Sequence, residues 1–167
     1  GSHNQRDYLN KALANGVKFI NISPLKSDLD IVDDMEWVPL RPNSDVALML
    51  ALCYEINKAG ATNRDFINKY TVGFEKFTEY LNGNTDGVAK NADWASQITG
   101  ISLEGIFELI EKIKKSKKTM ISVSWSLTRQ SHGEQPYWAA IALASIIGDI
   151  GKPGGGIGFG YSAMNSI

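Results

Sequence analysis

The stretch that decides the fold runs over 119–160 and begins with Thr119-Met-Ile-Ser-Val-Ser124. This run of β-branched and apolar residues predicts a short buried strand. It is followed by the polar loop Trp125-Ser-Leu-Thr-Arg-Gln-Ser-His-Gly-Glu-Gln-Pro136, an apolar helix predicted over 135–149, and a glycine-rich run over 151–160. Ligands of open α/β sheets lie outside the carboxyl ends of the parallel strands, so the loop after this strand is the predicted ligand site.

Working outward, the remaining segments show helical periodicity interrupted by one further short apolar run. The sequence predicts a strand over 17–22 and helices over 5–15, 45–59, 64–70, 74–81, 91–98 and 102–115. We expect 25–40 to be irregular, and about 62–100 to be a helical insertion between two core strands, because a minimal crossover is much shorter. Short buried strands that alternate with helices predict an α/β fold with a doubly wound, mainly parallel sheet flanked by helices.

The bulk composition is that of an ordinary globular domain. The chain has 167 residues, 43% of them hydrophobic and 21% charged, with a net charge of −1. There is no basic patch of the kind that nucleic-acid binding requires, and no apolar run long enough to span a membrane. The single cysteine, Cys53, excludes a disulfide framework and is predicted to pack in the core.

Both ends of the sequence suggest a piece cut from a larger protein. Gly1-Ser2-His3 has the composition of a scar left by an expression tag, and the chain then begins directly in a helical pattern. Residues 4–167 are therefore expected to form part of one domain of a larger protein.

The glycine-rich run has two readings. It lacks the Gly-Lys-Ser or Gly-Lys-Thr ending of a phosphate-binding Walker loop, and it follows a helix, whereas the Rossmann fingerprint follows a strand. One reading is therefore a helix stop with Gly151 after the last turn, followed by a flexible exit. The other is a backbone without side chains that a large ligand approaches closely.

Acidic residues offer two candidate sites. Asp45 opens a predicted helix, with Asn43 or Ser44 as its N-cap, and its carboxylate suits either the helix dipole or the paired N–H donors of a guanine. The cluster before it lacks the spacing of a calcium-binding EF-hand loop, so we expect a solvated loop. The cluster consists of Asp28, Asp30, Asp33, Asp34 and Glu36.

The loop after the strand at 119 carries the remaining candidate chemistry. Arg129 suits a phosphate because its guanidinium is planar and always charged, but a local ion pair with Glu134 is an equal alternative. His132 has no nucleophile motif and no second histidine at metal-ligand spacing, so we interpret it as a structural residue. Tyr137 and Trp138 on the next helix are predicted to be core residues.

Two blocks of the sequence resemble one enzyme family. The first is Trp125 to Gln135 with the apolar helix and Gly151-Lys-Pro-Gly-Gly-Gly-Ile-Gly-Phe-Gly-Tyr161, and the second is Arg41-Pro-Asn-Ser-Asp-Val-Ala-Leu-Met-Leu50. Together with the segment between them, they resemble the dimethyl sulfoxide reductase family of molybdopterin oxidoreductases. That resemblance implies a parent enzyme that reduces S-oxides or N-oxides with bis(molybdopterin guanine dinucleotide) molybdenum. Residues 160–167 look closer to the biotin sulfoxide reductase branch than to typical trimethylamine N-oxide reductases.

The resemblance also implies which residues bind the cofactor. Asn43, Ser44 and Asp45 fall on the block that contacts the guanosine, and Trp125, Ser126 and Arg129 fall on the one that contacts the pterin and diphosphate. At the end of the first strand, Ile22 contributes only its backbone, and Ser23 stands where relatives commonly carry an aspartate. The metal-ligating serine of the family lies in an earlier segment, so no residue here is catalytic or a metal ligand, and we expect the isolated chain to be inactive.

The expected partners of the parent are a small S-oxide or N-oxide (biotin sulfoxide, methionine sulfoxide, dimethyl sulfoxide or trimethylamine N-oxide) and an electron donor such as a c-type cytochrome. We expect a periplasmic parent, with the cytoplasm as the alternative. Two other functions stay open: a domain of a formate dehydrogenase or nitrate reductase type of molybdopterin enzyme, and a non-catalytic α/β interaction domain.

Overall fold

The computed structural model describes residues 5–29 and 35–159. Its helices are α1 (Gln5–Ala14), α2 (Asp45–Lys58), α3 (Arg64–Tyr70), α4 (Phe74–Leu81), α5 (Ala92–Thr99), α6 (Leu103–Lys115) and α7 (Gln135–Ile147). Short 3-10 turns form η2 (Lys26–Leu29) and η3 (Trp125–Thr128), and the strands are β1 (Ile20–Ser23), β2 (Glu36–Pro39), β3 (Met120–Val123) and β4 (Gly156–Phe159).

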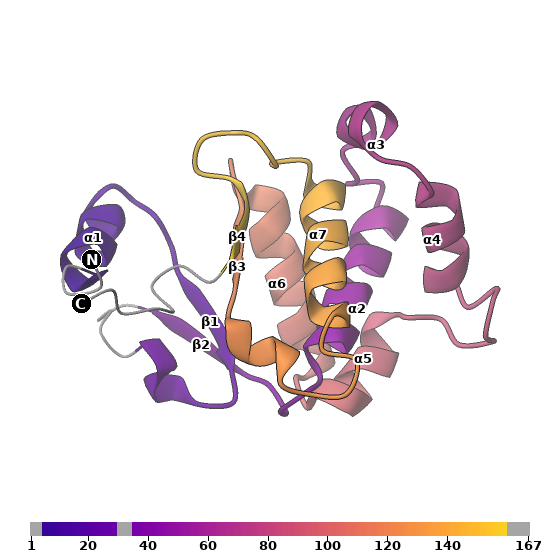
Figure 1. Ribbon diagram of the computed structural model, residues 1–167, viewed down its shortest axis with the longest axis horizontal. Coiled ribbons are helices and arrows are strands. Elements are labelled where there is room, and N and C mark those ends of the chain that lie inside the picture. The colour runs from indigo at the N-terminus through magenta and orange to yellow at the C-terminus, as the bar shows by residue number, and fades with distance from the viewer. Residues whose placement is uncertain (1–4, 30–34, 160–167) are drawn as a thin grey trace.

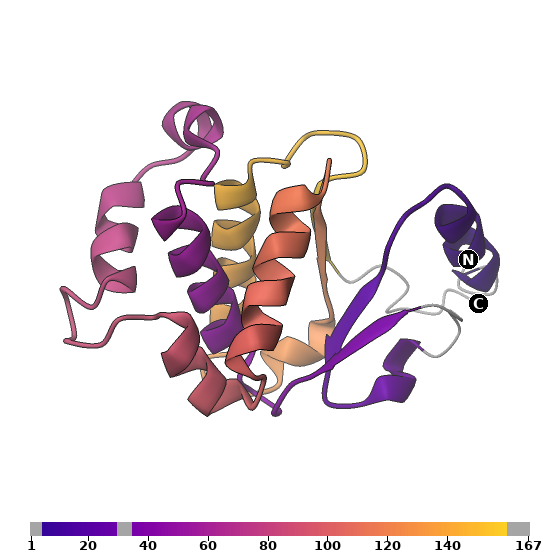
Figure 2. The ribbon, with the colours of Figure 1, turned by 180° about the vertical axis from the view of Figure 1, so that it is seen from behind.

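The strands form two parallel pairs. β1 pairs with β2, with Ser23 opposite Pro39, and β3 pairs with β4, with Val123 opposite Phe159. Figures 1 and 2 show the β3–β4 pair between the β1–β2 pair and the helices α2, α6 and α7. The predicted α/β class with parallel strands is confirmed, and in the described residues the sheet consists of these two separate pairs.

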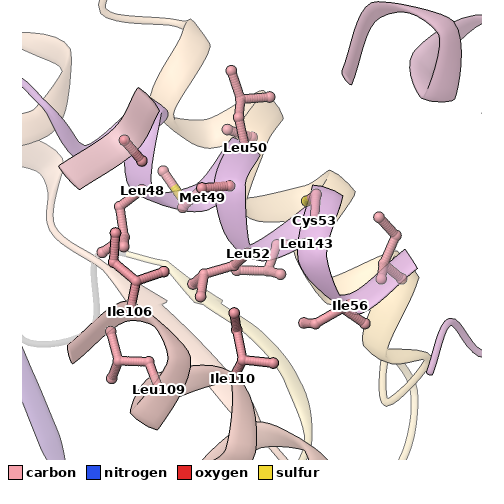
Figure 3. Close-up of a cluster of buried hydrophobic side chains, with 14 of the residues drawn as sticks. Leu48, Met49, Leu50, Leu52, Cys53, Ile56, Ile106, Leu109, Ile110 and Leu143 are labelled. Carbon is pink, nitrogen blue, oxygen red and sulfur yellow. The ribbon is translucent and has the colours of Figure 1, made fainter. Parts of the chain in front are cut away.

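Helix α2 is the centre of the core. Its residues are apolar along nearly the whole length, and 47–53 are buried on every side of the helix. Leu48, Leu52 and Ile56 of α2 pack with the apolar stripe of α6 and with Leu143 of α7 (Figure 3). Cys53 is fully buried among them, as predicted, and burial raises the pKa of its thiol far above the ordinary range.

Local signals in the sequence set most helix ends. The side chains of Asn63, Asn91 and Ser102 each accept a hydrogen bond from a backbone N–H in the first turn of the helix that follows. Gly100 ends α5 in the left-handed conformation. Ser44 precedes α2 as predicted, but its hydroxyl donates to the Arg41 carbonyl at 2.6 Å and does not cap the helix.

The structure corrects three predictions about the chain path. Residues 36–39 are a strand, not irregular, because parallel pairing with β1 stabilises a segment too short to show periodicity. Helix α7 ends at Gly148, which has a φ of 78°, before the predicted Gly151. The glycine-rich run is not a simple flexible exit, since Gly156 to Phe159 form β4 against β3.

Within the predicted acidic cluster, the backbone of Asp28 lies in η2 and Glu36 begins β2. Glu36 pairs with Lys112 of α6 at 2.5 Å. Asp30, Asp33 and Asp34 lie outside the described residues. Among the residues that the structure describes, no group of three or more His, Cys, Asp or Glu side chains could hold a metal ion.

Candidate functional site

The predicted cofactor residues follow the carboxyl ends of three parallel strands. Ile22 and Ser23 are the last residues of β1, 43–45 lie between β2 and α2, and 125–129 come directly after β3. Figures 1 and 2 place the ends of these strands, the start of α2 and the loop before α7 at the same, lower end of the molecule. The carboxyl ends of parallel strands are where open α/β sheets bind their ligands.

The end of β1 is held by hydrogen bonds to the backbone. The Ser23 hydroxyl donates to the Leu25 carbonyl at 2.6 Å, and the Ser23 carbonyl accepts from the indole N–H of Trp37 at 3.1 Å. The Ile22 side chain packs against the core and is partly buried. Ser23 therefore retains its hydroxyl oxygen mainly as an acceptor.

The loop from β2 to α2 is fixed from one side by Arg41. Its guanidinium donates to the Gln97 carbonyl at 2.8 Å, and its backbone N–H donates to the Thr99 carbonyl at 2.9 Å. No role for Arg41 is predicted from the sequence, and in the structure it anchors the loop on the end of α5. Asn43 is exposed and has a φ of 64°, a left-handed conformation that asparagine tolerates better than most residues.

Asp45 is a half-buried carboxylate at the first position of α2. Partial burial raises its pKa above the ordinary aspartate value, and a hydrogen bond from its own backbone N–H only partly offsets this effect. None of the ion pairs formed among the described residues uses Asp45. The described residues therefore place a partly desolvated acceptor at the positive end of a helix and supply no cation for it.

The segment after β3 is held by Ser124. Its hydroxyl accepts from the Ser126 N–H at 3.3 Å and lies 2.9 Å from the Ser126 hydroxyl. The Trp125 ring lies 6.0 Å from the Phe159 ring, and the Tyr137 ring meets Phe159 edge-on at 4.9 Å. Tyr137 also donates its hydroxyl to the Ser124 carbonyl at 3.0 Å, which ties the start of α7 to the loop.

This aromatic group contains residues that the sequence assigned otherwise. Tyr137, predicted to be a core residue, is half-buried and supports the loop. Phe159, predicted to lie in a glycine-rich exit, is part of β4. The alternation of glycine with Ile157 and Phe159 is a period of two, the signal that could have identified β4. Trp138 is not a core residue as predicted: 65% of its surface is exposed.

Arg129 is exposed, and in the described part of the chain its side chain forms no ion pair or hydrogen bond. The predicted alternative, a pair with Glu134, is not formed among the described residues; Glu134 Oε1 lies 3.8 Å from His132 Nδ1. His132 itself is exposed, has a φ of 57°, and lies in the turn that leads to α7. The Arg129 guanidinium is thus left available for an anion.

Gly133 shapes the loop that carries Arg129. A Cβ at this position would lie 2.1 Å from the Thr128 carbonyl oxygen, so only glycine allows the loop to fold back on itself. The Arg129 N–H donates to the Ser126 carbonyl at 3.0 Å and closes the same turn.

A hollow of about 320 Å³ lies elsewhere, between α7 and the turn from α3 to α4. Its lining residues fall within 67–77 and 138–146 and include none of the predicted cofactor residues. No helix within the described ranges is long and apolar enough to cross a membrane.

Comparison with known proteins supplies the chemical context. A family model described as molybdopterin oxidoreductase matches residues 3–165. The chain is 46% identical over its whole length to a biotin sulfoxide reductase of Cereibacter sphaeroides, covering 22% of that protein. It is also 42% identical over 95% of its length to a trimethylamine-N-oxide reductase of Haemophilus influenzae, covering 19% of that protein.

Among solved structures, acetylene hydratase from Pelobacter acetylenicus has a similar fold. The TM-score is 0.72 at 25% identity, and the match covers 88% of this chain and 19% of the hydratase. The chain thus spans about a fifth of the length of the relatives that it matches.

Proposed function

This chain belongs to the molybdopterin oxidoreductase family, and on that premise we propose that it is the part of a molybdenum S-oxide or N-oxide reductase that holds the guanosine and diphosphate of bis(molybdopterin guanine dinucleotide). Identities of 46% and 42% to a biotin sulfoxide reductase and a trimethylamine-N-oxide reductase support this choice within the family. The substrate class is then a small S-oxide or N-oxide, with biotin sulfoxide favoured by the higher identity.

Asp45 is the single observation that carries the guanine assignment. A guanine presents adjacent N–H donors at N1 and N2, and one carboxylate accepts both in a charge-assisted bidentate contact. Asp45 meets the requirement because it has no cation partner among the described residues and is already partly desolvated. Adenine offers no such pair of donors, so the same carboxylate discriminates against it.

The other residues divide the remaining contacts by their chemistry. Arg129 binds the diphosphate through its planar, permanently charged guanidinium. Ser126, Asn43 and Ser23 offer short polar side chains or carbonyls to the sugar and phosphate oxygens. Trp125 covers the diphosphate side with an aromatic face.

On this proposal, the cofactor carries out the chemistry and the residues of this chain bind it. When bound, the molybdenum cofactor supplies oxygen-atom transfer and two-electron redox chemistry. The residues of this chain orient the cofactor from its nucleotide ends and neutralise part of its charge. The 167-residue chain is accordingly expected to have no reductase activity alone.

The test is on the full-length enzyme that contains this chain. We expect molybdenum by metal analysis and, after acid release, two guanine nucleotides for each molybdenum. Adenine nucleotide, or no nucleotide, would reject the proposal. Iron bound near the N-terminus of the parent would instead support the formate dehydrogenase or nitrate reductase type of molybdopterin enzyme.

Asp45 can be tested with a matched control. Replacing Asp45 with alanine should lower cofactor occupancy about tenfold, because a hydrogen bond to a charged group contributes about 1.5–3 kcal/mol. Asp65→Ala removes a different carboxylate, which is exposed in the first turn of α3, and should leave occupancy unchanged. Equal loading of the two variants would remove Asp45 from the site.

A further inference from the structure

The hollow between α7 and the turn from α3 to α4 has a mainly apolar lining. One wall is formed by Trp138, Ile141 and Ser145 of α7, and the other by Ile67, 71–74 and Phe77. Thr71 and Ser145 each donate their hydroxyl hydrogen to a carbonyl of their own helix, at 2.7 and 2.8 Å. An occupant of this hollow therefore meets apolar surface and no free hydroxyl donor.

Helix α7 has the composition of a helix buried on all sides. It contains no charged residue, and its buried face, with Ala140, Leu143 and Ala144, packs within the chain. Its outer face carries Trp138 and Ile141, which are 65% and 48% exposed. A helix that is hydrophobic all round belongs in the interior of a larger protein.

Helix α6 provides a contrast within the same molecule. Its exposed positions include the charged residues Glu104, Glu108, Lys112 and Lys115, as expected of a face that meets water, beside the apolar residues Leu103 and Phe107. Opposite α7, the turn from α3 to α4 presents Val72 with its whole surface exposed. Figure 1 shows α7 along the near face of the helical cluster with α3 and α4 beside it, and in Figure 2 α7 lies behind.

We propose that this hollow, together with Trp138, Ile141 and Val72, is an intramolecular docking site. Its occupant is an apolar segment of the same polypeptide, drawn from the roughly four-fifths of a relative's length that these 167 residues do not include. Contiguous apolar patches rimmed by polar residues mark sites of protein contact. The inference rests on the proposed function only in placing the chain inside a longer polypeptide.

The first test compares the same substitutions in two polypeptides. Replacing Trp138 and Ile141 together with glutamine should lower the melting temperature of the full-length enzyme by at least about 4 °C. In the 167-residue chain, where both side chains are already exposed, the shift should stay within about 1 °C. Tyr70→Gln is the matched control: Tyr70 is 63% exposed and lies outside the hollow, and we expect no shift in either polypeptide.

A second measurement does not depend on the variants. Oxidative footprinting with mass spectrometry should modify Trp138 readily in the 167-residue chain and at least about tenfold more slowly in the full-length enzyme. Equal oxidation in both polypeptides, or a full-length enzyme that tolerates the double variant as well as Tyr70→Gln, would overturn the proposal. A dimer of the 167-residue chain that dissociates in the double variant would assign the face to a second copy and also overturn it.

Molybdenum analysis of the same preparations separates this inference from the proposed function. A full-length protein without molybdenum that still protects Trp138 would reject the proposed function and support the docking site. A molybdenum-loaded enzyme in which Trp138 stays reactive would support the proposed function and reject the docking site.

Discussion

Asp45 shows how a residue proposed to bind a ligand can weaken the fold that carries it. Its carboxylate is partly removed from water and no positively charged side chain among the described residues compensates it. The raised pKa means that the folded state holds the proton more tightly than the unfolded chain does. Above the folded pKa, the charged form therefore costs stability, and that cost disappears as the pH falls toward the ordinary aspartate value.

Asp45→Asn should consequently make the 167-residue chain more stable at neutral pH. The difference in free energy of unfolding between variant and parent sequence should shrink as the pH is lowered through the folded pKa of Asp45, since the parent then becomes neutral too. Chemical denaturation at a series of pH values measures this difference. A variant less stable than the parent at pH 7 would show that the helix dipole outweighs desolvation here.

At the scale of single elements, glycines set the geometry of both ends of α7. Gly133 lets the loop with Arg129 fold against the Thr128 carbonyl. Gly148 ends α7 at a point where the Asn63 side chain lies close to the backbone. The Asn63 N–H donates to the Ile146 carbonyl at 2.9 Å, so the end of α7 and the start of α3 are joined. These elements are positioned by close backbone approach as much as by apolar burial.

Gly133→Ala should disturb the loop more than the core. The new Cβ would overlap the Thr128 carbonyl, and relief of that overlap requires the backbone around Arg129 to move. We expect a loss of stability of about 1–3 kcal/mol and a fall in cofactor occupancy of the full-length enzyme. Thermal unfolding and metal analysis measure the two effects, and occupancy equal to that of the unmodified enzyme would contradict a role for the loop.

Gly148→Ala and Gly60→Ala separate conformational strain from steric overlap. Both glycines have positive φ, at 78° and 69°, but an added Cβ would lie 2.4 Å from the Asn63 side chain at Gly148 and would meet open space at Gly60. Gly60→Ala should cost about 1 kcal/mol from strain alone. Gly148→Ala should cost more, about 2–4 kcal/mol in denaturant unfolding; equal costs would show that Asn63 moves aside freely.

For the whole molecule, the two strand pairs differ in how they are supported. The β3–β4 pair packs against α7, and Asp149 joins the end of that helix to the start of β3 by accepting from the Thr119 N–H at 2.9 Å. The β1–β2 pair meets the core through Ile20, Ile22 and Val38, which are only partly buried, and through the exposed Glu36–Lys112 pair. Exposed ion pairs contribute little, about 1 kcal/mol or less.

The β1–β2 pair should therefore open before the helical core unfolds. Backbone amides of 20–23 and 36–38 should exchange with deuterium through local opening, whereas those of α2 should exchange only on global unfolding. Native-state hydrogen exchange followed by mass spectrometry distinguishes the two classes. Identical opening free energies in β1 and α2 would show that the chain unfolds as one cooperative unit.

Local chemistry in the sequence determined most of the helices, their asparagine, serine and glycine ends, the strand at β3 and the family. These depend on residues within a few positions of one another or on a long shared pattern. The α/β class followed as well, because short buried strands that alternate with helices have few ways to pack.

Only the tertiary structure decided the strands at β2 and β4, the exposure of Trp138, the hydrogen bonds of Arg41 and the lack of a side-chain partner for Arg129 among the described residues. A four-residue strand is stabilised by a partner far away in the chain, and glycine has no side chain to signal the pairing. Trp138 is apolar and helical in spacing, so the sequence cannot tell a face packed inside this chain from one left open. Which polar groups remain unpaired within the described ranges, Asp45 and Arg129 among them, depends on neighbours that only folding brings together.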